Sequence, residues 1–335
     1  MAALYIFTRT RQDRFCKSAA APKPSGRIRL LNLLAAIALA GCTLPDTARD
    51  PATPRALLQQ WVGITGAQAG TPRPGSPGTG YITLRRPTAM SARDNEVYLI
   101  DAGLNRIFRY DRFQQTLTPF TNLSANADMS IYAAPDRSVY IADPHRSEVL
   151  HYTWDGTQLP SFISPGNLAR PVSVVVDESS GQLLVADGLF DQIIAFNSLG
   201  MTLSVVRPQP ALAIAAMTTG PDGIYVVDRL GRRVVVLGRN GAFRYTLGAT
   251  DMGTPGAIVV SRDNLVFVGD NFDQTIKVYQ GQGTGTGNGI LVAKVGGTGA
   301  APGNYNGIAG MAVDGSLLYV ADSLNARVQI MLINR

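Results

Sequence analysis

The chain has 335 residues, 45% of them hydrophobic, with 35 glycines, 20 prolines, and 30 basic against 24 acidic side chains. This composition is typical of a turn-rich globular protein and excludes a largely disordered chain. From Cys42 onward basic and acidic side chains are equal at 23 each, and since nucleic-acid binding requires a surplus of basic groups, we expect no nucleic-acid partner.

Residues 1–41 have the pattern of a leader followed by a secretory signal peptide. Two arginines precede the apolar run LLNLLAAIALAGC, which is too short to span a bilayer. The end of this run, Leu39-Ala40-Gly41-Cys42, resembles the processing site of bacterial lipoproteins. That resemblance implies cleavage after Gly41 and lipidation of Cys42, with the lipid as the only contact with the membrane. Because Thr follows the cysteine where Asp would favour retention, it also implies the outer membrane and the periplasm-facing side.

The range 42–79 starts with the lipidated cysteine and continues as a segment dominated by Pro, Gly, Thr and Ala, which predicts a tether. Within it, Arg55–Trp61 has the composition of one or two turns of helix. The next segment, GYITLRR at 80–86, predicts a single extended strand.

From about residue 80 to the C-terminus, one unit occurs six times. Each copy has an apolar run, an aspartate, a short polar turn and a second apolar run, as in EVYLIDAGLNRIFRY from Glu96 and LLYVADSLNARVQI from Leu317. The aspartates are Asp101, Asp143, Asp187, Asp228, Asp270 and Asp322, at intervals of 42, 44, 41, 42 and 52. The last interval is longer because it contains the glycine-rich run GQGTGTGNG at 281–289. A period of this length in strand-forming sequence predicts a β-propeller.

The blades of this propeller are expected to have four strands each. A run of smaller residues precedes each pair of apolar runs and suits the innermost strand, and fourth runs such as AFRYTLG at 242–248 complete the blades. The last copy ends after three strands. We therefore predict an all-β, six-bladed propeller over 80–335, closed by the N-terminal strand 80–86, which completes the last blade.

The hairpin of the last copy carries a family resemblance. Tyr319-Val320-Ala321-Asp322, followed by Asn325 and Arg327, resembles the hairpin that marks the NHL-repeat family of six-bladed propellers. An arginine follows the aspartate by five residues in three copies, at Arg106, Arg233 and Arg327. This spacing predicts an ion pair across the turn, so we interpret the repeated aspartates as structural and not as a ring of metal ligands.

Residues with recognisable chemistry are few. His145 and His151 are six residues apart, which is about 20 Å in a strand and too far for one metal ion. Motifs for a covalent nucleophile are missing. We therefore expect no catalytic residue, no metal and no cofactor.

The remaining candidates lie in the turns that would form one mouth of the propeller. Aromatic and arginine side chains at such a rim favour a protein contact. The candidate rim consists of Phe190, Phe272, Arg146, Arg229 and Arg232. The expected function is a non-catalytic binding or assembly module that recognises another protein of the cell envelope. Two alternatives stay open: a calcium-dependent propeller hydrolase similar to lactonases and esterases, and a carbohydrate-binding propeller.

Overall fold

The computed structural model describes residues 57–70, 80–282 and 289–334, which belong to one compact unit from Pro54 to Arg335. These residues form β-strands almost throughout, with one short 3₁₀ helix, η1 (Ser323–Asn325). No helix of this part of the chain is long and apolar enough to cross a membrane. The predicted cleavage and lipidation residues (Leu39, Ala40, Gly41 and Cys42) lie outside the described residues, as do positions 283–288 of the glycine-rich run.

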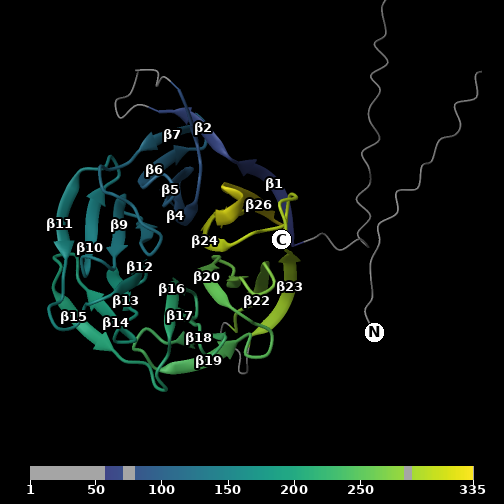
Figure 1. Cartoon of the computed structure of the whole chain (residues 1–335). Helices are drawn as coiled ribbons and strands as arrows, with labels where there is room; N and C mark the ends of the chain where they lie inside the picture. The colour runs from purple at the N-terminus through teal and green to yellow at the C-terminus, as the bar shows by residue number, and fades with distance from the viewer. Residues whose placement is uncertain (1–56, 71–79, 283–288, 335) are drawn as a thin grey trace, which may run out of the picture. The chain divides into compact units, whose positions relative to one another are not determined.

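The strands form six sheets arranged in a ring, as blades of a β-propeller (Figure 1). Blade one contains β4 (Pro87–Arg93), β5 (Glu96–Asp101), β6 (Arg106–Asp111) and β7 (Thr116–Pro119). Blade two contains β8 (Ser130–Ala133), β9 (Ser138–Asp143), β10 (Glu148–Thr153) and β11 (Gln158–Phe162). Blade three contains β12 (Pro171–Asp177), β13 (Gln182–Asp187), β14 (Gln192–Phe196) and β15 (Thr202–Val206).

The second half of the ring follows the same order. Blade four contains β16 (Ile214–Gly220), β17 (Gly223–Asp228), β18 (Arg233–Leu237) and β19 (Phe243–Leu247). Blade five contains β20 (Pro255–Val260), β21 (Leu265–Asp270), β22 (Thr275–Gln280) and β23 (Ile290–Gly296). Blade six contains β24 (Ile308–Asp314), β25 (Leu317–Asp322), β26 (Arg327–Ile333) and, as its outer strand, β1 (Leu58–Ile64). The predicted all-β, six-bladed propeller of four-stranded blades is confirmed.

The strand that closes the ring is not the predicted one. In the structure β1 pairs with β26 along its length, from Leu58 opposite Ile333 to Ile64 opposite Val328, and it lies beside β26 in Figure 1. The strands of the propeller therefore begin within the segment expected to be a tether, and the helix expected at Arg55–Trp61 is wrong. The free edge of β26 offers backbone hydrogen-bond partners to β1, and this tertiary pairing outweighs the intrinsic helical preference of Leu and Gln.

The predicted strand 80–86 lies beside blade one instead. Its central part, β3 (Tyr81–Thr83), pairs with β2 (Gly66–Ala69), and β2 runs parallel to the outer strand β7. Blade one thus becomes a six-stranded sheet. The prediction that an N-terminal strand completes the last blade is correct, but the segment that does so is about twenty residues earlier.

The core of the propeller lies between its blades. Six clusters of buried apolar side chains are present, one between each pair of neighbouring blades. The second strands are buried on both faces, and all six residues of β17 are buried. This arrangement explains why these strands read as continuous apolar runs rich in Val and Ile, since neither face meets water.

The two ends of each blade define two faces of the ring. The hairpin between the second and third strands and the connection from the preceding blade lie at one end, which we call the hairpin face. The turns between strands one and two and between strands three and four lie at the other end, the turn face. The turn after Arg93 is one of them, with positive φ at Asp94 (52°) and Asn95 (69°), as a tight type I′ hairpin turn requires.

Candidate functional site

The repeated aspartates hold the loops of the hairpin face in place. In blade three, Asp187 accepts hydrogen bonds from the backbone N–H groups of Ala169 (2.6 Å) and Arg170 (2.7 Å) in the incoming connection. Its other oxygen accepts from the N–H groups of Leu189 and Phe190 in the hairpin, each at 2.9 Å. All six repeated aspartates are at most 3% exposed. A buried carboxylate whose lone pairs are used in this way is a structural group with little capacity left for a ligand.

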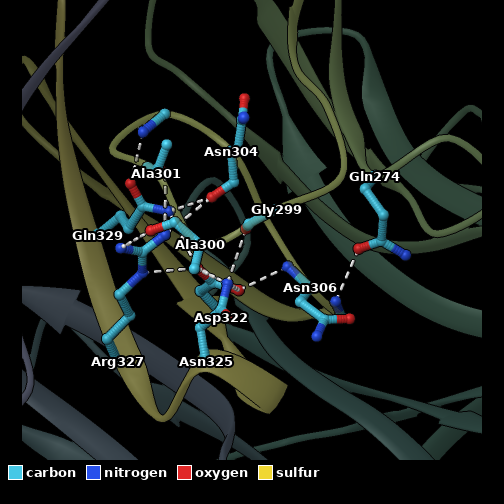
Figure 2. Close-up of polar contacts among 12 residues, drawn as sticks. Gln274, Gly299, Ala300, Ala301, Asn304, Asn306, Asp322, Asn325, Arg327 and Gln329 are labelled. Atoms are coloured by element: carbon cyan, nitrogen blue, oxygen red, sulfur yellow. Dashed lines mark hydrogen bonds and ion pairs between the residues drawn. The ribbon is translucent and has the colours of Figure 1, made fainter.

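In blade six this arrangement extends into a larger polar network (Figure 2). Asp322 accepts from the N–H of Asn306 (2.7 Å) and from the side chains of Asn325 (2.9 Å), Arg327 (2.7 Å) and Gln329 (3.0 Å). The remaining guanidinium N–H groups of Arg327 donate to three backbone carbonyls, those of Ala300, Ala301 and Asn304. The network therefore fixes the connection between blades five and six.

The arginines five residues after the aspartates do not all behave alike. Arg233 lies 3.1 Å from Asp228, and Arg327 lies 2.7 Å from Asp322. Arg106 stands opposite Asp101 in the β5–β6 ladder but is exposed, and no ion pair joins the two among the described residues. The spacing thus permits an ion pair without requiring one, because Asp101 already accepts four backbone N–H groups.

A cavity of about 1200 Å³ occupies the centre of the ring and is lined by the first strand of every blade. At the turn face two ion pairs join different blades: Arg93 to Glu178 (2.5 Å) and Arg239 to Asp177 (3.1 Å). Within the described ranges, no three His, Cys, Asp or Glu side chains are grouped so that they could hold a metal ion. The cavity wall therefore presents small residues of the first strands, together with charged side chains of which some are paired between blades.

The two histidines lie in different surroundings. His145 is exposed in the hairpin of blade two, with Nε2 4.0 Å from the carboxylate of Asp128. His151 stacks on Tyr140 at 4.6 Å between ring centroids, and its Nε2 is 3.1 Å from Ser138 Oγ. Burial lowers the pKa of His151, which keeps the ring neutral at pH 7. Its contacts are those of a packed side chain.

The hairpin face carries exposed apolar side chains on four consecutive blades. Blade three exposes Leu189 and Phe190, and blades four, five and six expose Leu230, Phe272 and Leu324 at their hairpins. These side chains have little structural reason to be apolar, because they make no contribution to the clusters between blades. We call these five residues the apolar tips.

The predicted rim residues all lie on this hairpin face. Arg146 is half exposed and approaches Asp143 (3.5 Å) and Glu148 (3.8 Å). Arg229 and Arg232 belong to the hairpin of blade four and are exposed. Leu189, Leu230 and Leu324 were not among the residues predicted from the sequence. The signal was available, because each of these leucines stands two residues after a repeated aspartate.

Comparisons with known proteins support the fold. No protein-family model matches the chain, and no curated protein matches it. Among solved structures, a streptogramin B lyase has a TM-score of 0.57 and 12% identity, covering 76% of this chain and 95% of its own. A catalytically inactive virginiamycin B lyase from Staphylococcus aureus with quinupristin has a TM-score of 0.56 and 14% identity, covering 83% and 99% respectively.

These similarities establish a six-bladed propeller with enzymes among its structural neighbours. At such low identity the likeness concerns the fold alone, because one fold supports many unrelated activities. The resemblance to NHL repeats and to lipoproteins remains a prediction from the sequence.

Proposed function

We propose that the protein is a lipid-anchored, NHL-type propeller of the bacterial outer membrane that faces the periplasm and binds another envelope protein through its hairpin face. It acts in this role as a non-catalytic binding or assembly module. The observation that carries the proposal is the set of apolar tips. Exposed apolar side chains at the same hairpin position of four consecutive blades are a feature that protein interaction sites use.

The position of β1 supports this orientation of the molecule. Leu58 pairs with Ile333, the residue of β26 farthest from the hairpin, so the chain enters blade six at the turn face. Fifteen residues separate Cys42 from Leu58, and they span at most about 50 Å. A propeller held to the membrane by this short link at its turn face leaves the hairpin face accessible to a partner.

An enzyme remains the second candidate, because the structural neighbours include lyases. Its site would be the central cavity of about 1200 Å³. The described lining has no converging set of carboxylates and histidines, so we rank this candidate below a binding module. We also place the two alternatives from the sequence, calcium-dependent hydrolysis and carbohydrate binding, below a protein-binding module.

The test is recovery of the lipidated protein from its native envelope after chemical crosslinking, with mass spectrometry of what co-purifies. Phe272→Ser on the hairpin face is compared with Phe113→Ser on the turn face, since both rings are 78% exposed. We expect a stoichiometric partner with the wild type and with Phe113→Ser, reduced recovery of that partner with Phe272→Ser, and its loss when Phe272→Ser is combined with Phe190→Ser. Equal recovery by all variants would exclude the hairpin face as the binding surface.

The anchor is tested separately. Cys42→Ala should move the protein from the membrane fraction to the soluble periplasmic fraction without changing its thermal unfolding midpoint. If it stays in the membrane fraction, the lipid-anchor proposal is wrong.

The enzyme candidate has its own test. If the purified protein hydrolyses lactone or ester substrates, the propeller is an enzyme and the non-catalytic binding module is disfavoured.

A further inference from the structure

Exposed arginines without an ion pair occur next to one another on the hairpin face of blades three and four. On the turn face, Arg93, Arg109 and Arg239 are each within ion-pair distance of a carboxylate: Glu178, Glu96 and Asp177 respectively. On the hairpin face, four exposed arginines of blades three and four have no ion pair with any described carboxylate: Arg170, Arg207, Arg229 and Arg232. These four arginines form a local group of positive charge on the hairpin face, although the chain from Cys42 onward is neutral as a whole.

These arginines surround the apolar tips of the same two blades. The backbone of Arg170 is held by Asp187, the residue that also holds Leu189 and Phe190. The hairpins of blades three and four meet at one place, since Asp191 Oδ1 accepts from the N–H of Ile214 (3.3 Å) and the N–H of Arg229 donates to Ala213 (3.0 Å).

One patch results from this convergence. We define the basic patch as Arg170, Arg207, Arg229 and Arg232 together with Leu189, Phe190 and Leu230. Two of its members, Arg170 and Arg229, also line the hairpin-face mouth of the central cavity. The blade-three hairpin also contains one carboxylate, Asp191, which accepts a hydrogen bond from the N–H of Ile214, so the four arginines of the patch outnumber it.

We infer that the basic patch binds an acidic protein segment in which carboxylates flank an apolar side chain. This inference rests on the proposed function and adds the chemistry of the partner. Guanidinium groups bind carboxylates through paired N–H···O bonds, and the neighbouring tips provide apolar contact for the side chain between them. Charge at the rim of such an interface also accelerates association at low salt.

The test uses defined peptides and the full folded protein. A fluorescent peptide rich in glutamate with one central phenylalanine is compared with its glutamine counterpart by fluorescence anisotropy, at about 50 and 300 mM salt. We expect the acidic peptide to bind, the glutamine peptide to bind at least about tenfold more weakly, and the affinity to fall at high salt. Equal binding of both peptides, or no binding of either, would overturn the inference.

A matched variant locates the binding. Arg170→Gln combined with Arg229→Gln should weaken acidic-peptide binding by at least about tenfold. Arg262→Gln should leave it unchanged, because Arg262 lines the same cavity at the turn face and is also exposed without a described ion pair. The inference is wrong if the two variants behave alike, or if the protein binds phosphatidylglycerol vesicles through these arginines but ignores the peptide.

The inference and the proposed function can fail separately. If crosslinked partner recovery depends on Phe190 and Phe272 but is insensitive to salt and to Arg170→Gln with Arg229→Gln, the hairpin-face binding module stands and the acidic partner is excluded. If recovery is independent of Phe190 and Phe272, the proposed function itself fails.

Discussion

Lys277 and Asp270 form an ion pair in the interior of blade five, with 3% of the lysine side chain exposed and none of the aspartate side chain. Lys277 also donates to the carbonyl of Asp251 and lies 3.4 Å from Asp273. It follows its aspartate by seven residues, the position that Gln329 occupies after Asp322 in blade six. A polar side chain on the third strand can therefore support the repeated aspartate as well as the predicted arginine can.

Replacing Lys277 tests the energy of this pair. Lys277→Ala should lower the free energy of unfolding by about 3–5 kcal/mol, because it leaves the buried Asp270 carboxylate without its cation. The matched control is Lys294→Ala, since Lys294 lies 2.8 Å from Asp273 but is half exposed, and its removal should cost less than about 1 kcal/mol. Urea denaturation followed by circular dichroism measures both, and similar losses would show that burial does not matter here.

Stability should fall at acidic pH. Burial on its own would raise the pKa of Asp270, but hydrogen bonds from Lys277 and from backbone N–H groups outweigh it and hold the pKa below its ordinary value. The pKa of Asp177 is likewise lowered, with burial outweighed by hydrogen bonds from Ser180, Arg239 and Ser179.

A depressed carboxyl pKa stabilises the fold above the unfolded-state pKa and loses that effect as pH falls through the folded-state pKa. The free energy of unfolding should therefore change little above about pH 5 and decrease below about pH 4. Asp177→Asn should be less stable at neutral pH and less sensitive to acid. If the free energy of unfolding of this variant falls with decreasing pH as steeply as that of the wild type, Asp177 does not contribute to the acid sensitivity.

Removing the closing strand should destabilise the propeller far more than removing the segment before it. A chain starting at Pro54 should keep its unfolding midpoint. A chain starting at Gly66 lacks β1, exposes the edge of β26 and loses the burial of Leu58, which is 4% exposed. We expect its midpoint to fall by on the order of 10 °C in differential scanning calorimetry, and an unchanged midpoint would contradict closure by β1.

Two buried tyrosines should respond oppositely to loss of their hydroxyl groups. Tyr225 donates to Asn264 Oδ1 (2.6 Å), and Asn264 Nδ2 donates to Asp222 (2.8 Å), so Tyr225→Phe breaks a buried network and should cost about 1–3 kcal/mol. Tyr305 Oη is buried with no hydrogen-bond partner among the described residues. Tyr305→Phe should accordingly be neutral or stabilising in chemical denaturation.

Most of the fold could be predicted from the sequence because each blade is specified by local sequence patterns. The period of the repeated aspartates, the paired apolar runs and the turn residues after Arg93 are short-range features, and each reports the same blade. The hairpin slots that hold Phe190 and Phe272 follow from that period. The identity of the closing strand could not be predicted in this way. Both β1 and the segment 80–86 are short extended segments, and local sequence does not show which of them pairs with β26.

The sequence by itself determined the blade, its number of copies and the aspartate that orders each hairpin, because these depend on contacts within about forty residues. Only the tertiary structure decided the contacts between distant residues. Closing the ring brings Leu58 to Ile333 and places the arginines of blades three and four on one face. Charges and apolar side chains that are scattered along the chain become a surface only when the blades are arranged around a common axis.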